Sequence, residues 1–423
     1  MAARLARAMM ARLFCFAVAR PRPAAFDSGA AMNTGKLMNM PLLALAISAF
    51  AIGTAEFVVM GLLPEIAGDM AISIPDSGHL VSGYALGVVI GGPVIGMAIR
   101  STREKSALIA LMLMFVAGNA GCLLAPGFGW LMLARVFTAL SHASFIGTAA
   151  VLASRLAPPG KEAQAMVLML SGMTLANVLG VPLGSLLGQL QGWRATFLAV
   201  MLLGLLAVAL IAGFVPAGRG SPSASAGAGS DMRRPVVWLG LATSVMASAS
   251  MFAFFTYIVP VLLQVTHVEA KVATAALFVC GIGITIGGLL GGRLADWNLP
   301  RALTLTLPCL IAVLIAFYWA SASLYPALAC MVLWGGLSFA VGMMLQALII
   351  KVAGNAAGYA STLNIGAFNL GNAIGAWLGG RVLEMGWAFN AITLLAAALA
   401  AVTLVMVVAV LWTARRAPRS LLV

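Results

Sequence analysis

Long apolar stretches, separated by short polar loops, recur along the whole chain. The hydrocarbon core of a bilayer is about 30 Å thick, so a helix that crosses it needs roughly 20 apolar residues. Twelve stretches of about this length are present. They cover residues 41–63, 79–99, 106–125, 130–153, 164–187, 196–215, 236–262, 272–294, 302–322, 325–350, 358–380 and 388–413. The pattern predicts an all-α integral membrane protein with twelve transmembrane helices.

The composition supports this placement in the lipid bilayer. Hydrophobic residues make up 62% of the chain, charged residues make up 8%, and the mean hydropathy is +1.07. Soluble domains are nearer half apolar and a quarter charged. A membrane enzyme or sensor would need a catalytic cluster or a sizeable soluble domain, and the longest polar segment between spans covers only residues 216–235. We therefore expect no enzymatic activity.

The net charge of +13 reflects how basic residues are distributed between the loops. With the amino terminus in the cytoplasm, twenty Lys and Arg residues fall in inward loops and tails. Only three, Arg194, Lys271 and Arg381, fall in outward loops. This is the positive-inside pattern of membrane proteins. The charge therefore predicts that both termini are cytoplasmic, and it gives no reason to expect a nucleic-acid partner.

The two halves of the chain match each other at a shift of about 196 residues. LGVVIGGPVIGMAIR in the second span lies over CGIGITIGGLLGGRLAD in the eighth, and NVLGVPLG in the fifth lies over NAIGAWLG in the eleventh. Pro64 falls on Pro260 near the ends of spans one and seven. Such matches in chain order predict two parallel six-helix repeats, an arrangement found in transporters.

These boundaries divide the chain into five parts. The predicted six-helix bundles cover 38–215 and 236–413, and the Gly-, Ser- and Ala-rich segment 216–235 is expected to be a flexible cytoplasmic linker. Residues 414–423 form a basic cytoplasmic tail. Residues 1–37 are rich in arginine, so we expect a basic disordered tail or a start placed upstream of the true one. A transit peptide of similar composition is the alternative.

Nucleotide, metal and disulfide chemistry have no support in the sequence. No GxxxxGK[ST] motif is present, and the spaced glycines at 281–287 lie inside a predicted span with no strand before them. The five cysteines show no CxxC or His/Cys ligand spacing. We expect no cofactor and no metal, so any active transport must use an ion gradient.

Four segments carry motifs that depend on glycine, proline or charged residues. GGRLADWNLPR follows the eighth span and includes Asp296 and Arg301. LMLARVFTALSHA in the fourth span includes Arg135, and GTAEFVVMGLLPEIA begins in the first. SGMTLANVLGVPLGSLLG in the fifth span contains Gly172, Asn177, Gly180, Pro182, Gly184 and Gly188. Together they resemble the major facilitator superfamily, and more narrowly its drug:proton antiporter branch.

The resemblance is strongest to permeases for arabinose, purine-nucleoside or chloramphenicol efflux. It implies two six-helix halves that rock about a central site in the bacterial inner membrane, and we expect a monomer. In the family pattern Asp296 and Arg301 belong to a cytoplasmic gate. The first copy of that loop, GMAIRSTREK, has Arg100 in place of the aspartate, so a gating role is expected only of the second copy.

Two formal charges lie well inside the predicted spans, Glu56 and Arg135, and His142 is a third titratable group there. Charges at the bilayer centre cost about 2.5–3.5 kcal/mol on insertion scales, so they usually face a bundle interior or a wet cavity. Glu56 lies eight residues before Pro64, roughly 12 Å deep at 1.5 Å per residue. The depth of Arg135, five residues after Trp130, is roughly 8 Å by the same rise, so the two side chains lie at depths from which they could meet.

The three charged positions suggest a proton path in the first half. Arg135, Thr138 and His142 are spaced i, i+3 and i+7, so they share one helix face. Burial disfavours a carboxylate and a nearby arginine favours it, so Glu56 is expected to change protonation during a transport cycle. A static ion pair that only fixes helix packing is the alternative for Glu56 and Arg135. His142 has the alternative of a plain hydrogen bond.

The second half has no charge at the matching positions, so we expect it to supply an apolar substrate surface. The predicted substrate cavity is lined by Thr138, Phe252, Phe255, Tyr257, Trp334 and Gln346. Ordinary packing or contact with lipid is the alternative for the aromatic residues. The predicted function is export of a small organic solute or drug in exchange for protons. A proton:solute symporter that works in uptake has the same fold and charges and is the alternative.

Overall fold

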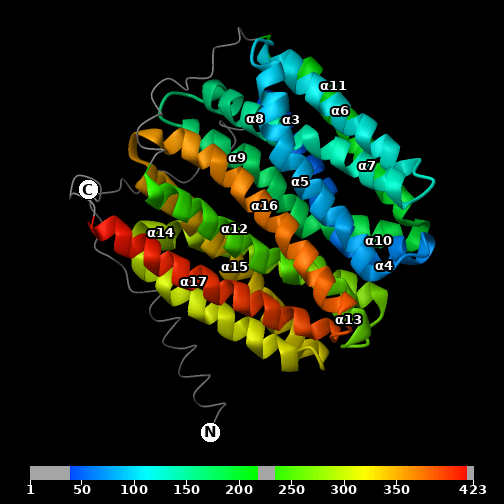
Figure 1. Ribbon diagram of the computed structural model, residues 1–423. Coiled ribbons are helices and arrows are strands. Elements are labelled where there is room, and N and C mark those ends of the chain that lie inside the picture. Colours follow the sequence, from blue (N-terminus) through cyan, green and yellow to red (C-terminus); the bar gives the residue numbers. More distant parts are fainter. Residues whose placement is uncertain (1–38, 218–233, 417–423) are drawn as a thin grey trace, which may run out of the picture. The chain divides into compact units, whose positions relative to one another are not determined.

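The computed structural model describes residues 39–217 and 234–416 (Figure 1). The first half contains α3 (Met40–Phe57), η1 (Val58–Gly61), α4 (Leu63–Asp69), α5 (Ile74–Ile99), α6 (Glu104–Leu123), α7 (Phe128–Leu140), α8 (His142–Leu156), α9 (Glu162–Leu175), η2 (Ala176–Gly180), α10 (Val181–Gln191) and α11 (Trp193–Phe214). The second half contains α12 (Pro235–Thr256), α13 (Ile258–Gln264), α14 (Ala270–Ala320), α15 (Leu324–Ala353), η4 (Gly354–Ala356), α16 (Ala357–Glu384), η5 (Phe389–Ala391) and α17 (Ile392–Arg416). The described ranges contain no strand. The predicted tail 1–37, linker residues 218–233 and tail residues 417–423 lie outside them.

Ten helical segments in the described ranges are long and apolar enough to cross a membrane, and two of them hold two predicted spans each. α14 leaves the helical conformation at Asn298 (φ −166°, ψ 90°), between the predicted spans 272–294 and 302–322. Asn298 Oδ1 accepts a hydrogen bond from the Arg301 backbone N–H at 3.0 Å, which caps the helix that follows. α15 and α16 meet at Gly354, whose φ of 53° favours glycine. The prediction of twelve spans is confirmed.

Within residues 40–423 the helices gather into two bundles. α3 to α11 make up the first bundle and α12 to α17 make up the second (Figure 1). One cluster of buried apolar side chains, which includes Leu42, Phe115 and Phe145, lies wholly within the first bundle. A larger cluster runs across both bundles and includes Phe57 and Phe252. The apolar core is therefore continuous between the bundles where α3 and α12 end.

The bundles contact each other at the end of the helices where α4, α10 and α13 lie, here called the α4/α13 end. Gln189 Nε2 on α10 donates to Thr274 Oγ1 at 2.9 Å and to the Ala270 carbonyl at 3.2 Å, both on α14. Ser82 Oγ on α5 donates to the Ala373 carbonyl on α16 at 3.0 Å. These hydrogen bonds hold the two bundles together at this end.

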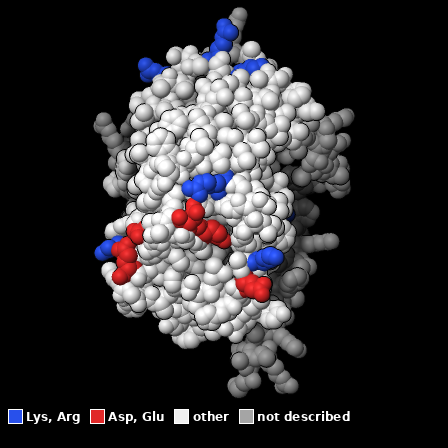
Figure 2. Space-filling model, turned by 90° about the vertical axis from the view of Figure 1, so that its right-hand side faces the viewer, with Lys and Arg blue, Asp and Glu red and all other residues white. Residues whose placement is uncertain are grey.

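Few charged side chains lie at the α4/α13 end. The face in Figure 2 is largely uncharged, and its few acidic groups lie next to basic ones. Asp69 Oδ2 accepts from Arg194 Nη1 at 2.6 Å and from Trp193 Nε1 at 2.9 Å, and Arg381 pairs with Glu384. The basic residues of the predicted outward loops are therefore partly neutralised by neighbouring acids.

Candidate functional site

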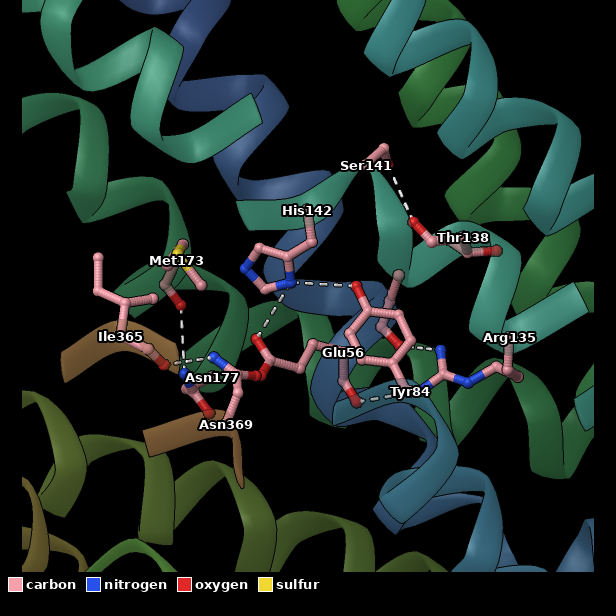
Figure 3. Close-up of polar contacts among 11 residues, drawn as sticks. Glu56, Tyr84, Arg135, Thr138, Ser141, His142, Met173, Asn177, Ile365 and Asn369 are labelled. Carbon is pink, nitrogen blue, oxygen red and sulfur yellow. Dashed lines mark hydrogen bonds and ion pairs between the residues drawn. The ribbon is translucent and has the colours of Figure 1, made fainter. Parts of the chain in front are cut away.

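Glu56 lies next to the end of α3, where the first span continues as a tighter helix. The α-helical part ends at Phe57 and the 3-10 turn η1 follows. The Glu56 side chain is buried, and its Oε2 lies 4.0 Å from His142 Nδ1 on α8. The same His142 nitrogen lies 3.3 Å from Tyr84 Oη on α5 (Figure 3). A carboxyl group, an imidazole and a phenol from three helices therefore meet inside the first bundle.

Arg135 contacts the backbone carbonyl of Glu56 rather than its carboxylate. Its Nη1 donates to the Ala55 carbonyl at 2.6 Å, and its Nη2 donates to the Glu56 carbonyl at 3.5 Å. The guanidinium carbon lies 4.2 Å from the centre of the Tyr84 ring, a cation–π arrangement. Arg135 therefore contacts the Glu56 segment through its backbone, and no ion pair between the two side chains is present among the described residues. The titratable side chain that approaches the carboxyl group is His142, which carries a charge only when it is protonated.

The change of helix type leaves an acceptor for arginine at the end of α3. In an α-helix the carbonyl of Ala55 would accept from the backbone N–H four residues later. That N–H belongs to η1, in which each bond spans three residues instead of four. A carbonyl is skipped where the bonding pattern changes, and Arg135 Nη1 donates to the Ala55 carbonyl there. The fully buried arginine thus fixes the position of the segment that carries Glu56.

The fifth-span motif lies against α3 through its glycines. A Cβ added to Gly172 would lie 2.1 Å from the Ala46 carbonyl oxygen, and one added to Gly180 would lie 2.1 Å from Thr54 Oγ1. Gly184 and Gly188 face Val58 and Leu62 in the same way. Small residues therefore let the two helices approach closely. These contacts are made by residues that precede Glu56 in the chain and by residues that follow it.

A π-helical turn precedes Pro182 in the same span. η2, Ala176–Gly180, is a single π turn, and Pro182 stands in the first turn of α10 directly after it. Proline has no N–H to continue an α-helical ladder, and a wider turn accommodates this loss. The fifth span is therefore irregular before Pro182, in the form of a π turn. It also touches the second bundle, because a Cβ on Gly281 would lie 2.7 Å from the Asn177 carbonyl oxygen.

Aromatic side chains join the two bundles next to Glu56. Phe57 lies 6.2 Å, between ring centres, from both Phe252 and Phe255 on α12. Phe255 lies 5.5 Å from Trp334 on α15. Trp334 Nε1 is buried and has no hydrogen-bond partner among the described residues. These four residues, here called the aromatic group, include three of the six predicted substrate residues.

The other three predicted substrate residues lie elsewhere. Thr138 Oγ1 donates to the Ala134 carbonyl and packs on Gly118 of α6, because the helix turns this face into the first bundle. Tyr257 Oη donates to the Ala376 carbonyl at 3.0 Å and lies against Gly78, at the α4/α13 end. Gln346 exchanges hydrogen bonds with Ser361 and Asn364 within the second bundle. We therefore leave these three residues out of the proposed site.

Asp296 and Arg301 lie on the surface at the α14 kink. Both residues are exposed, and no ion pair of either is present among the described residues. Arg301 takes part through its backbone N–H, which Asn298 caps. The structure thus shows this loop without a charged contact to the first bundle.

Two residues near Glu56 were not predicted from the sequence. Tyr84 is a lone tyrosine in a Gly-rich apolar helix, and Asn369 lies in the eleventh span, more than 300 positions from Glu56. In Figure 3, Asn369 and Asn177 both lie beside the Glu56 carboxyl group, on the side away from Arg135. Their only signal in the sequence is that each is a polar side chain within an apolar span.

Comparison with known proteins agrees with this picture. Residues 45–365 match the model of the Major Facilitator Superfamily. The chain is 40% identical over 393 residues to "Inner membrane transport protein YdhP" of Escherichia coli (strain K12), covering 91% of this chain and 99% of that protein. It is 33% identical to "Putative transporter AraJ" of the same strain, with 86% and 92% covered. It is also 33% identical to "Chloramphenicol resistance protein" of Streptomyces lividans, with 80% and 88% covered.

Solved structures share the fold at low sequence identity. A bacterial homologue of the human lysosomal transporter Spinster, in an inward-facing and occupied conformation, gives a TM-score of 0.72 at 18% identity, covering 88% of this chain and 96% of that one. A D-xylose–proton symporter gives 0.69 at 13% identity, covering 87% and 96%. The fold and the relatives define a multi-pass membrane transporter of small molecules, not an enzyme. The chain belongs to the Major Facilitator Superfamily, as its motifs predict.

Proposed function

We propose that this transporter exports small organic solutes, of sugar, nucleoside or phenicol type, in exchange for protons. Alternating access, in which two repeats rock about a fixed site, is the general mode of such folds. Export is supported by the fifth-span motif and by the name of the chloramphenicol resistance protein, which is 33% identical. The inner membrane is the proposed location, in keeping with the name of the 40% identical relative.

The observation that carries the proposal is the surroundings of the Glu56 carboxyl group. It is buried with His142 Nδ1 at 4.0 Å, while the nearby arginine is bound to backbone carbonyls. A permanent ion pair with arginine would hold the carboxylate ionised throughout. Glu56 lacks that partner, so it can take up a proton when the site closes and release it when the site meets water. This is the behaviour that proton coupling needs.

The neighbouring groups give the proton a short route. Tyr84 Oη and Glu56 Oε2 approach the same nitrogen of His142, so a proton can move among the three groups with small displacements. Phe57 follows Glu56 directly and contacts Phe252 and Phe255 of the second bundle. A change of charge on Glu56 would therefore occur next to the contact between the two bundles. We propose that protonation and solute binding bias that contact in opposite directions.

The proposed orientation follows the distribution of charge. We place the α4/α13 end at the outer side, since the loops there carry the three outward basic residues Arg194, Lys271 and Arg381. The bundles are in contact at that end through Ser82 and Gln189. On this assignment the structure represents the state closed toward the outside. The energy is sufficient, because one proton at about 150 mV supplies roughly 3.5 kcal/mol.

The test is proton release from acidified proteoliposomes that contain the purified transporter, read with a pH-sensitive dye. Arabinose, inosine and chloramphenicol are added in turn to wild type and to Glu56→Gln. We expect at least one solute to collapse the gradient in wild type and none to do so in the variant. Equal responses of the two proteins would reject Glu56 as the coupling group.

The direction of transport separates export from uptake. Vesicles with an acidic interior should accumulate radiolabelled solute inside if the transporter exchanges solute for protons. Under the same gradient a proton:solute symporter would drive the solute out of the vesicles. Solute that leaves with protons would therefore replace the export proposal by the uptake alternative.

A further inference from the structure

Two buried asparagines near Glu56 have oriented carboxamides. Asn177 Nδ2 donates to the Met173 carbonyl at 3.2 Å, and Asn369 Nδ2 donates to the Ile365 carbonyl at 3.0 Å. A carbonyl only accepts, so these bonds fix which end of each carboxamide is the nitrogen. Both Oδ1 atoms are buried and have no hydrogen-bond partner among the described residues. Two acceptors are thus left without a donor.

The two asparagines come from different bundles. Asn177 belongs to the π turn η2, which packs on α3 close to Glu56, since a Cβ on Gly53 would lie 3.0 Å from Ala176 Cβ. Asn369 lies on α16 one turn before Ala373, where α16 contacts α5. In Figure 3 both carboxamides lie beside the Glu56 carboxyl group, on the side away from Arg135.

Exposure rises along α16 from Asn369 toward the start of the helix. Ile365 lies one turn earlier on the same face and is 41% exposed, whereas Asn369 is only 7% exposed. On the proposed orientation the start of α16 lies toward the cytoplasm. The proposed path of the solute to the asparagine pair leads from that side.

We propose that Asn177 and Asn369 are paired acceptors for two neighbouring hydroxyl groups of the transported solute, one acceptor on each bundle. This inference rests on the proposed function and names the chemistry of its substrate. A buried polar group without a partner destabilises the state that contains it. A diol supplies one donor to each carboxamide and so favours the state in which the two bundles close on the solute.

The neighbouring side chains indicate the rest of the solute. Both Oδ1 atoms only accept, so they select hydrogen-bond donors on the solute. Phe57 directly follows Glu56 and contacts Phe252 and Phe255 of the aromatic group. The site therefore fits a solute with a diol at one end and an apolar or aromatic part at the other.

The experiment combines ligand changes with residue changes. Purified transporter in detergent is titrated with inosine, with 2′,3′-dideoxyinosine, which lacks the diol, and with chloramphenicol as a second hydroxylated probe. We expect wild type to bind dideoxyinosine about tenfold more weakly than inosine, the effect of about 1.4 kcal/mol of hydrogen bonding. Asn177→Ala and Asn369→Ala should each remove most of that preference and leave dideoxyinosine binding unchanged.

Asn119→Ala is the matched control. Asn119 is also fully buried, donates Nδ2 to a carbonyl four residues earlier at 2.8 Å, and has an unpartnered Oδ1. It lies on α6 within the first bundle, away from the contact between bundles. Asn119→Ala should therefore keep the preference for inosine. The comparison of ligands on wild type alone keeps the test valid if an asparagine variant unfolds.

Several outcomes would overturn the paired-acceptor proposal. These are binding of neither hydroxylated probe by wild type, equal affinity for inosine and dideoxyinosine, and loss of the preference in Asn119→Ala. Proton release measured in parallel separates this inference from the proposed function. Diol preference without proton release would refute exchange and keep the acceptor pair. Proton release without diol preference would support exchange and refute the acceptor pair.

Discussion

Gly172→Ala tests whether the glycine face of the fifth span positions the Glu56 segment. The added Cβ would lie 2.1 Å from the Ala46 carbonyl oxygen and 2.9 Å from the Phe50 nitrogen. A carbon and an oxygen normally approach to about 3.3 Å, so α9 and α3 must separate by about 1 Å. Both contacting atoms belong to the α3 backbone, so no side-chain rotation relieves the clash.

Overpacking of this kind costs about 1–3 kcal/mol. We expect the apparent melting temperature of the detergent-purified variant to fall by a few degrees, and solute-induced proton release to weaken because Glu56 moves with α3. Gly147→Ala is the control, because nothing lies within 4 Å of the added Cβ on this glycine of α8. A Gly172→Ala protein with the melting temperature and proton release of wild type would refute the reasoning.

Three further predictions follow from single contacts. Pro182→Ala should fold and insert but leak protons or lose coupling, because the π turn before it relaxes; normal coupled transport by this variant would count against the idea. Phe252→Ala and Phe255→Ala should change the order of preference among apolar solutes in transport assays, and an unchanged order would assign them to packing alone. The pKa of the Asp69 carboxyl lies below its ordinary value near 3.8, first because Arg194 and then because Trp193 donates to it. The stabilisation that the ionised Asp69 gives is present above that value and is lost as pH falls through the lower folded pKa. Asp69→Asn should therefore make the melting temperature less sensitive to acid, by the equivalent of less than about 1 kcal/mol. Identical pH profiles of the melting temperature in wild type and variant would contradict this prediction.

The spans were predictable because length and apolarity alone decide them. The sequence also indicates the close approach of the fifth span to another helix, since Gly172, Gly180, Gly184 and Gly188 recur at helical spacing. The similar depths of Glu56 and Arg135 follow from the rise per residue along each helix. Each of these inferences depends on one helix considered by itself.

The rotation of each helix was not predictable in the same way. In a membrane protein the face toward lipid and the face toward other helices are both apolar, so the hydrophobic pattern does not distinguish them. Thr138 shares α7 with Arg135 and lies in the same predicted span as His142 of α8, yet its side chain packs on Gly118 within the first bundle. Asn369 reaches the neighbourhood of Glu56 only because α16 crosses to the first bundle near α5.

The partner of Glu56 also depended on a local change of helix type. Where α3 gives way to the 3-10 turn η1, Arg135 donates to the backbone carbonyls of Ala55 and Glu56 rather than to the carboxylate. Nothing in the residue types of that segment requires a 3-10 turn. The sequence therefore places the two charged residues at similar depths, but it does not predict which atoms of Glu56 the arginine contacts.

The most direct measurement of the central claim compares counterflow with gradient-driven transport in Glu56→Gln. Proteoliposomes loaded with unlabelled solute are assayed for exchange of labelled solute without a pH gradient, and then for accumulation driven by one. We predict that the variant retains counterflow, because binding and rocking need no proton, and loses accumulation driven by the gradient. Retention of both activities, or loss of both in a folded protein, would contradict the role of Glu56 as the proton carrier.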